Sequence, residues 1–487
     1  MLHGGRLGNV RDSVAHFTSS RKDDARLIEA VLAINKAHIA MVMEQKIIQW
    51  QLGAKILTAI ASLSASTLDP AAEDVHMAVE EAILAQTGPE IGGNMHIAKS
   101  RNDQVTTAIR MTLRNELLSI MQKILDMQQS LLDTAAKHLD TIILEYTHLQ
   151  AAQPVTYAHY LVSQYDALER DLQRLQSAYK RVNLSPLGAG ALATTSFPLN
   201  RKRTSVLLGF DDVLENSIDA VGSRDFIIET IAALSLTAVN LSRFAEDLII
   251  WSSAEFGTVE LPDEFTSTSS IMPQKKNPEC LEVIRARASY VLGDYVAVVA
   301  AIKSLPTTYN LDFQEMTPKL WAVTDNLNVS LVIFAQLVPN IKVFSDIKTK
   351  AAMGFVGATE LANVLVRKYG VAFRTAHKVV GALVKVLIDS KQTLLNVTPQ
   401  LLQKTAKDSA SLELIVELED IVGCTNPRKI VEAYKVQGGP SPVEVERVLK
   451  EKFKSRLEAE KAVLSLKTAL SDASSILDAL VGSYSSQ

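Results

Sequence analysis

The sequence has 487 residues, of which 47% are hydrophobic and 21% are charged, and its formal net charge is -4. This length predicts roughly two to four domains with a substantial apolar core. The weak negative charge argues against nucleic acid or an anionic membrane as a partner. The 21 glycines and 15 prolines lie below the average shares of about 7% and about 5%, which favours long helices and predicts an all-α fold.

The two cysteines, Cys280 and Cys424, lie far apart in the sequence and form no CxxC pair. This arrangement indicates neither a disulfide framework nor a structural zinc site, and it suits a reducing compartment. Residues 1–12 lack the apolar core of a signal peptide, and the longest apolar run, residues 295–302, is far shorter than the roughly 18 residues that span a bilayer. We therefore expect a soluble, cytoplasmic protein.

Residues 1–100 are predicted to form an N-terminal helical domain, which ends at the loop-like stretch 87–94 (TGPEIGGN). Residues 101–350 follow as a central domain with three apolar stripes. The stripes are Leu113, Leu117, Ile120, Ile124, Met127 and Leu131; Tyr157, Leu161, Tyr165, Leu168, Leu172, Leu175, Tyr179 and Val182; and Ile227, Ile231, Leu234, Ala238, Leu241, Ala245 and Leu248. Their steps of three and four residues are typical of long helices in a bundle.

The third stripe belongs to a segment, residues 226–251, that is apolar on more than one face. Its further apolar residues are Phe226, Ile228, Leu236, Val239, Phe244 and Ile249. Other helices must cover these residues, so we expect this helix to lie in a bundle core that is shared between subunits.

After about residue 350 the apolar pattern shortens, and residues 351–487 are predicted to form a small C-terminal helical domain. Chain breaks lie at residues 425–427 (TNP) and 438–442 (GGPSP), and a charged helix is predicted from about residue 443 to about residue 480. The sequence shows no internal repeat and no low-complexity segment.

Residues 266–278 (TSTSSIMPQKKNP) form a polar stretch between two long helical segments. Small residues, prolines and adjacent lysines argue against a place in the core. The simplest interpretation is a solvated loop. The alternative is a catalytic lid, because a serine-rich strip with Lys275 and Asn277 can close over an anionic substrate and present hydroxyl, ammonium and amide groups together.

Residues 269–278 (SSIMPQKKNP) resemble the signature loop of the fumarase/aspartase superfamily, whose members eliminate fumarate from succinyl compounds. The QKKN run at residues 274–277 is similar to that loop in the argininosuccinate lyase family. Three other segments agree: residues 96–105 (HIAKSRNDQV), 147–154 (THLQAAQP) and 186–193 (PLGAGALA). The resemblance implies a carbon–nitrogen lyase of arginine biosynthesis that eliminates fumarate from argininosuccinate and releases L-arginine. It also implies that the enzyme uses no metal or other cofactor and is a homotetramer with active sites shared between subunits.

The resemblance places the family's serine base at Ser269, six residues before the matching lysine, Lys275. A serine is a weak base at neutral pH, so it needs nearby positive charge and N–H donors that favour its alkoxide. Lys275 would also stabilise the aci-carboxylate that forms when the carbon next to a carboxylate loses its proton, and Asn277 would hold that carboxylate. His148 matches the family's acid, which protonates the departing guanidinium nitrogen, and Glu282 would orient its imidazole.

Further residues fall in family motifs that contact the substrate. They are Ser20, Ser100, Arg101, Asn102, Thr147, Ser270, Tyr309 and Gln314, together with Asn277. Asn102 is the choice for direct contact with a substrate carboxylate, and Tyr309 and Gln314 are assigned to the arginine end. The competing interpretation of Ser100 is a helix N-cap, although a cap would explain one residue of the run 100–103 rather than four.

The sequence departs from the family pattern at four positions. Thr268 replaces a glycine, Ala151 and Leu311 each replace an arginine, and Thr317 replaces a substrate-binding lysine, for which Lys319 is a candidate substitute. The serine, histidine, lysine and asparagine of the motif are present, so these changes affect the expected substrate affinity more than the expected reaction.

Two alternative functions stay open at this point. A sister lyase acting on adenylosuccinate, malate or aspartate would share the chemistry, but residues 100–103 and 274–276 argue against it. A crystallin-like structural homologue would need no active site, and the retained Ser269, His148 and Lys275 argue for a working one.

Other features of the sequence invite functional interpretations that we judge weaker. The glycine spacing of residues 188–193 matches a dinucleotide-binding turn, but no strand precedes it, which favours a close backbone approach. The basic cluster at residues 201–203 is expected to be a solvated surface. Four of the histidines, His38, His138, His159 and His377, are expected to be structural, and His76 and His96 receive no role.

Overall fold

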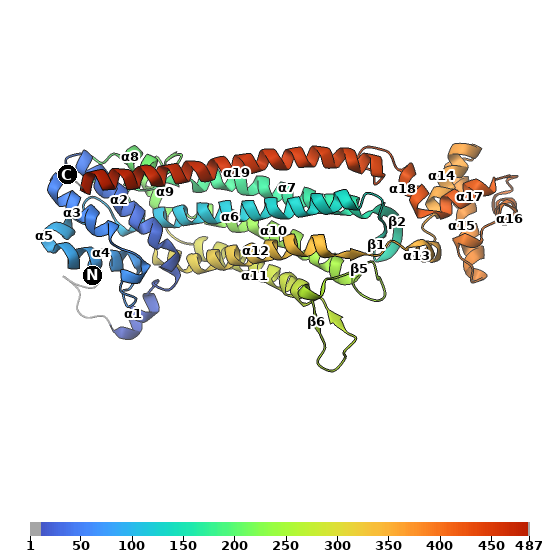
Figure 1. Cartoon of the computed structure of the whole chain (residues 1–487), viewed down its shortest axis with the longest axis horizontal. Helices are drawn as coiled ribbons and strands as arrows, with labels where there is room; N and C mark the ends of the chain where they lie inside the picture. Colours follow the sequence, from blue (N-terminus) through green and yellow to red (C-terminus); the bar gives the residue numbers. More distant parts are fainter. Residues whose placement is uncertain (1–10, 486–487) are drawn as a thin grey trace.

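A computed structural model describes residues 11–485, and these residues form an elongated, helical molecule (Figure 1). The all-α prediction is confirmed, because the strands are short and form only two-stranded pairs. Residues 1–10 lie outside the described residues, and with them most of the segment on which the expectation of no signal peptide rests.

Five long helices form the central bundle (Figure 1). They are α6 (Arg101–Lys137), α7 (Tyr157–Val182), α10 (Asp225–Trp251), α11 (Glu279–Ile302) and α12 (Met316–Leu337). One end of the bundle carries α1 (Asp12–Thr18), η1 (Asp23–Leu27), α2 (Ile28–Glu44), α3 (Trp50–Ala61), η2 (Ala65–Thr67), α4 (Val75–Thr87), α5 (Pro89–Gly92), η3 (Gly93–His96), α8 (Arg201–Leu207) and α9 (Ser217–Gly222). The opposite end carries α13 (Lys348–Met353), α14 (Ala358–Tyr369), α15 (Phe373–Asp389), η7 (Leu394–Asn396), α16 (Pro399–Ala410), α17 (Leu418–Thr425) and α18 (Pro427–Ala433).

The remaining elements are short, with one exception, α19. Strand β1 (Ile142–Thr147) pairs antiparallel with β2 (Gln150–Thr156), β3 (Leu184–Ser185) pairs parallel with β4 (Asp212–Val213), β5 (Val259–Glu260) pairs antiparallel with β8 (Lys342–Val343), and β6 (Ser267–Thr268) pairs antiparallel with β7 (Lys276–Asn277). The others are η4 (Asp263–Phe265), η5 (Leu311–Glu315), η6 (Val338–Asn340) and the long helix α19 (Pro442–Ser485).

The three predicted apolar stripes are confirmed as the inner faces of α6, α7 and α10. Every residue of the three stripes is buried, and all belong to one continuous core. Each fully buried leucine or isoleucine contributes about 1.5–3 kcal/mol relative to an exposed one, so these stripes supply much of the stability of the bundle. A separate apolar core lies within α14, α15, η7, α16 and α17.

The second apolar face of α10 is covered only in part. Phe226 and Phe244 are buried within the chain, whereas Leu236 is exposed. Exposed apolar residues continue over the neighbouring helices, and they include Val283, Tyr290, Leu292 and Val296 of α11 and Val329 and Val332 of α12. This surface is the face that a bundle shared between subunits would cover.

Two helical segments are long and apolar enough, by length and composition, to cross a membrane, namely α10 and residues 311–340. Neither segment was expected from the sequence to be able to span a membrane, because polar residues interrupt both of them and every unbroken apolar run is short. At least half of the most apolar part of each segment is buried inside the chain, as in the core helices of a bundle.

The placement of α19 corrects the prediction for the C-terminal part of the chain. The predicted domain of residues 351–487 includes α19, but this helix lies along the central bundle and ends beside the N-terminal helices (Figure 1). Its buried apolar residues are Val445, Leu449, Val463, Leu477 and Val481, and they join the main core rather than that of α14–α17. Their spacing is that of a narrow heptad stripe. The charged residues on the other faces of α19 kept this stripe from being recognised in the sequence. The bounds 1–100, 101–350 and 351–487 otherwise stay a prediction.

His38 links α2 to the segment that precedes α6. Its side chain is buried, and Nε2 donates a hydrogen bond to the carbonyl oxygen of Ile97 at 2.8 Å. Burial lowers the pKa of His38 to about 3, so the folded protein keeps this imidazole neutral under mildly acidic conditions.

We predict that His38 makes the protein sensitive to acid. Between the usual histidine pKa of 6.5 and about 3, the unfolded chain binds a proton that the folded chain does not bind, so stability is lost as the pH falls. The expected loss at about pH 5 is about 2 kcal/mol, and it should be absent in His38→Gln, whose amide can still donate to Ile97. Calorimetric melting temperatures at neutral and acidic pH test this, and equal acid sensitivity of both proteins would contradict it.

Candidate functional site

A cavity of about 230 Å³ lies where the N-terminal helices meet the bundle. The lining residues are Thr18, Ser20, Asp24, Glu73, Asp74, His76, Arg101, Val105, Ile109, Arg224, Tyr309, Leu311, Phe313, Gln314 and Thr317. Four predicted binding residues, Ser20, Arg101, Tyr309 and Gln314, thus come together here from three separate parts of the chain. The cavity combines carboxylates and guanidinium groups, so it suits a ligand that carries charges of both signs.

Two aspartates of this cavity were not found by sequence analysis. The Ser20 hydroxyl donates to the carboxylate of Asp24, whose pKa burial raises to about 6 against the opposing effect of this hydrogen bond. Asp74 accepts a hydrogen bond from the N–H of Met77 at 2.7 Å and forms an ion pair with Arg101. An aspartate just before a helix is interpreted from sequence as an N-cap, so the ion pair of Asp74 with Arg101 was not predicted.

Arg224 is the other residue that sequence analysis missed. Its buried guanidinium lies 4.4 Å from the ring centroid of Phe313 and donates to the carbonyl oxygens of Val221 (3.0 Å) and Ser223 (2.8 Å). Nε and Nη2 of Arg224 are also buried, and neither has a hydrogen-bond partner among the described residues. Burial lowers the pKa of Arg224 only to about 10, so at neutral pH an unpaired cationic donor lines the cavity. A carboxylate is the natural partner for such a group.

Tyr309 and Gln314 enter the cavity from the segment before α12. Gln314 donates from Nε2 to the carbonyl oxygen of Thr18 at 2.9 Å, and burial raises the pKa of Tyr309. The close approach of this segment to α9 depends on Gly222, where a Cβ atom would lie 2.1 Å from the carbonyl oxygen of Thr307.

Residues 100–103 begin α6 beside this cavity. Ser100 is the N-cap, and its hydroxyl accepts from the N–H of Asn102, so the capping interpretation of this residue is confirmed. Asn102 is half-buried and donates from Nδ2 to the carbonyl oxygen of Ala191 at 3.1 Å. Of the three predicted binding residues in this run, Arg101 lines the cavity, whereas Ser100 and Asn102 lie next to it.

The buried carboxylate of Asp103 explains the glycine-rich segment. Besides completing the capping box with Ser100, it accepts hydrogen bonds from the N–H groups of Gly188 (3.0 Å) and Gly190 (2.9 Å). Both glycines have positive φ angles, 85° and 63°, which a residue with a side chain adopts only with strain. The expected close backbone approach is therefore present, and these N–H groups point at an aspartate rather than being open to a phosphate.

The basic cluster at residues 201–203 is not only a solvated surface, which corrects that expectation. Arg201 donates to the carbonyl oxygens of Leu187 (3.0 Å) and Leu214 (2.8 Å). Arg203 forms an ion pair with Glu44 at 2.7 Å, so both arginines connect separate segments of the fold.

The departures from the family pattern fall in different places. Leu311 and Thr317 line the cavity, where they leave an apolar group and a hydroxyl in place of two cations. Lys319 does not replace the missing lysine, because it lies outside the cavity and forms an ion pair with Asp294 of α11 at 3.2 Å. Thr268 and Ala151 lie in β6 and β2, away from this cavity.

His148 lies at the exposed tip of the β1–β2 hairpin, at the other end of the bundle (Figure 1). Thr147 pairs with Gln150, so His148 and Leu149 form a two-residue turn with φ angles of 55° and 57°. Such turns usually contain asparagine and glycine, because side chains strain a backbone with positive φ. His148 and Leu149 therefore hold a strained backbone conformation at the tip of the hairpin.

Ser269 lies in the loop between β6 and β7, which projects from the side of the bundle (Figure 1). Its Oγ accepts hydrogen bonds from the N–H groups of Ile271 (3.3 Å) and Met272 (3.1 Å). These are the backbone donors that a serine needs to favour its alkoxide. Ser270, by contrast, is exposed and makes no such contact within the part of the chain that the structure describes.

The two lysines of the loop differ in their contacts. Lys276 forms ion pairs with Asp263 (2.6 Å) and Glu260 (3.6 Å) at the base of the loop. Lys275 is exposed and forms no ion pair with any residue between 11 and 485, so its ammonium group is available to a ligand. Asn277 donates from Nδ2 toward the Ser267 hydroxyl at 3.5 Å.

Glu282 is exposed in the first turn of α11 and has no contact with His148 within the chain. The predicted site residues therefore occupy three regions: the cavity with the adjoining start of α6, the hairpin tip, and the projecting loop with the start of α11. Among residues 11–485, no group of three or more histidine, cysteine, aspartate or glutamate side chains is arranged to hold a metal ion.

Two family models match the chain. One, described as Lyase, matches residues 6–293, and the other, described as Argininosuccinate lyase C-terminal, matches residues 355–432.

Relatives are found along nearly the whole chain. Argininosuccinate lyase of Methanocaldococcus jannaschii is 42% identical over 465 residues, which cover 94% of both chains. Argininosuccinate lyase of Methanothermobacter thermautotrophicus is 43% identical over 467 residues, which cover 94% of this chain and 99% of the relative.

Solved structures show the same fold. EDDS lyase in complex with formate has a TM-score of 0.88 and 30% identity, with 95% of this chain and 93% of that chain covered. A class II fumarase from Schistosoma mansoni, at 17% identity, has a TM-score of 0.70 and covers 83% of this chain and 90% of its own, which supports the fold alone.

Proposed function

Because the chain belongs to the argininosuccinate lyase family of the fumarase/aspartase superfamily, we propose how its residues carry out that family's reaction. The protein is a carbon–nitrogen lyase that releases fumarate and L-arginine from argininosuccinate. The observation that carries the assignment of residues is the cavity, where carboxylates lie beside the buried guanidinium of Arg224, two of whose nitrogens have no hydrogen-bond partner among the described residues.

The cavity binds the arginine end of the substrate. Nε and Nη2 of Arg224 receive the α-carboxylate, because they are buried donors without a partner among the described residues. Asp24 and Asp74 attract the cationic groups of the same end, and Tyr309 and Gln314 add hydrogen bonds. Ser20 acts with Asp24, to which it donates.

The succinyl end extends from the cavity toward residues 100–102. Asn102 holds a substrate carboxylate, with Ser100 and Arg101 close by. Thr147, Ser270 and Asn277 reach the same end from the hairpin and the loop when the site is assembled.

The elimination needs a base and an acid on opposite sides of the bond that breaks. The Ser269 oxygen removes a proton from the succinyl carbon next to a carboxylate, and Lys275 and the loop N–H groups stabilise the negative charge. The carbon–nitrogen bond then breaks, and its electron pair stays on the guanidinium nitrogen. His148 gives that nitrogen a proton while Glu282 orients the imidazole. No cofactor takes part in this sequence of steps.

The site is assembled from different subunits of a homotetramer. Helix α6 has 37 residues, so it is roughly 55 Å long. Residues 100–102 lie at the start of this helix and His148 follows its end, so a single straight helix keeps them apart. The exposed apolar residues of α10, α11 and α12 supply the surface on which copies of the chain pack to bring the parts together. The tetramer acts in the cytoplasm.

Replacing Arg224 tests the assignment of the arginine end. Arg224→Met should raise the KM for argininosuccinate by about 10²-fold, because it removes a charged hydrogen-bond donor, and the other guanidinium of the cavity, Arg101, is paired with Asp74. Arg224→Lys retains the charge without the planar fork and should show a smaller rise. Steady-state fumarate absorbance gives both values, and an unchanged KM in a correctly assembled Arg224→Met protein would exclude this role.

The choice of base is tested by comparing the paired serines. Ser269→Ala should lower turnover by at least ~10³-fold and leave the melting temperature nearly unchanged, because a loop hydroxyl contributes little to a helical core. Ser270→Ala is the matched control and should show a much smaller loss. Near-normal turnover by Ser269→Ala would eliminate Ser269 as the base.

Subunit mixing tests the shared site. His148→Ala and Ser269→Ala should each be inactive, but exchange of subunits between them should restore part of the activity, because some mixed tetramers hold a site with both residues intact. Exchange is verified with differently tagged subunits. Absence of recovery despite proven exchange, or a monomeric mass for the active enzyme, would refute the model.

A further inference from the structure

The turn between η3 and α6 leads directly into the substrate-binding run of residues 100–102. Within this turn Ala98 has a φ angle of 57°, in the left-handed region. A residue with a side chain pays about 1–2 kcal/mol for this conformation, so other contacts must hold the turn in place.

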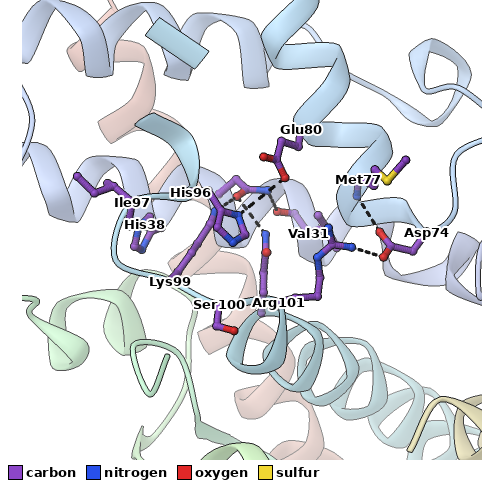
Figure 2. A network of polar contacts seen from close by, with 12 residues as sticks. Val31, His38, Asp74, Met77, Glu80, His96, Ile97, Lys99, Ser100 and Arg101 are labelled. Carbon is purple, nitrogen blue, oxygen red and sulfur yellow. Dashed lines mark hydrogen bonds and ion pairs between the residues drawn. The ribbon is translucent and has the colours of Figure 1, made fainter. Parts of the chain in front are cut away.

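Helix α2 supplies those contacts through two buried residues three positions apart, Asn35 and His38, which therefore share one helical face. His38 donates to the carbonyl oxygen of Ile97 on one side of Ala98. On the other side, the Lys99 ammonium donates to Oδ1 of Asn35. Asn35 and His38 thus hold both neighbours of the strained Ala98. Figure 2 shows His38, Ile97 and Lys99 together at this turn.

Asn35 is itself fixed in orientation. Its Nδ2 donates to the carbonyl oxygen of Val31 at 3.0 Å, and its Oδ1 also accepts from Nε2 of Gln104 at 3.2 Å. Asn35, Lys99 and Gln104 are all buried. The only hydrogen-bond acceptor that the described residues offer to the Lys99 ammonium is therefore a neutral amide oxygen.

The charged and titratable groups around Lys99 come from four elements. They are Asp103 and Arg101 on α6, Glu80 and His76 on α4, His96 on η3 and His38 on α2. Figure 2 shows Arg101, Glu80, His96 and His38 among them. Burial lowers the pKa of Lys99 to about 7, and Arg101 adds to this effect while Asp103 and Glu80 oppose it. Lys99 therefore exchanges its proton near neutral pH.

We propose that Lys99 is a positioning residue whose ammonium group, held by Asn35, fixes the turn that presents Arg101 and Asn102 to the substrate, so that substrate affinity depends on the charge of Lys99. Two physical effects act in the same direction. A charged donor forms a stronger hydrogen bond to Asn35 than a neutral amine does, and the positive charge raises the potential at the end of the site that receives a carboxylate. This inference rests on the proposed role of Arg101 and Asn102 in binding.

The proposal predicts that the KM for argininosuccinate rises by about tenfold as the pH increases from about 6.5 to about 9, because Lys99 loses its proton over this range. This pH range lies above the pKa of about 6 that burial gives Asp24 in the same cavity, so Asp24 keeps its negative charge through most of the measurement. Turnover should change much less with the charge of Lys99, since Ser269 and His148 belong to other parts of the assembled site.

Two substitutions isolate the charge. Lys99→Arg keeps a cation at every pH and should remove the pH-dependent rise in KM, whereas Lys99→Met should have a raised KM at all pH values. A Lys99→Arg enzyme with the full wild-type rise, or a folded Lys99→Met enzyme with the wild-type KM at about pH 6.5, would overturn the proposal.

A third variant covers the case in which Lys99→Met fails to fold. Asn35→Asp places a carboxylate against the ammonium group, which raises the pKa of Lys99, so the rise in KM should move to higher pH. An unchanged midpoint would overturn the proposal. Arg101→Gln distinguishes a failure of the proposed function from a failure of this inference. If Arg101→Gln leaves KM unchanged, the proposed binding role of residues 100–102 fails. If Arg101→Gln raises KM but the Lys99 and Asn35 variants keep the wild-type dependence of KM on pH, only the role of Lys99 is refuted.

Discussion

The length of α6 is the constraint on which the rest of the arrangement depends. A straight helix of this length ends far from where it began: Arg101 and Asn102 lie at its start, and the hairpin that carries His148 follows its end. No local rearrangement of the hairpin can close that separation, because the buried stripe of α6 holds it against α7, α12 and α19. The exposed apolar face of the bundle and the incomplete site are thus two results of the same geometry. Association of subunits would bury the apolar face and complete the site together.

The sequence predicted those parts of the structure that depend on local pattern. The heptad steps of α6, α7 and α10 identify buried residues because a helix must hide a continuous apolar stripe. The same logic failed for α19, where the stripe is narrow and the other faces are charged. The capping role of Ser100 is confirmed, and the assignment of the loop around Ser269 stays a prediction that rests on the motif of its neighbouring residues.

Arg224, Asp24 and Asp74 could not be found in this way. Arg224 and Asp74 contact residues distant in the chain: Arg224 stacks on Phe313, and Asp74 pairs with Arg101. Asp24 pairs with the nearby Ser20, but it shares the cavity with these distant residues. A single arginine between two helices, or an aspartate before one, has many common structural explanations. Only the fold shows that these groups face one cavity and that part of the guanidinium lacks a partner among the described residues.

The course of α19 also bears on how the protein is made. This helix is synthesised after all the other described helices, yet it covers α6, donating from Arg456 Nε to the carbonyl oxygen of Leu125 at 3.0 Å. It then reaches the N-terminal helices, where the Tyr484 hydroxyl donates to Glu44 at 2.9 Å. On the ribosome, the apolar residues of α6 that α19 covers therefore stay exposed until α19 has emerged. Apolar surface that is exposed during synthesis in this way promotes aggregation of a nascent chain.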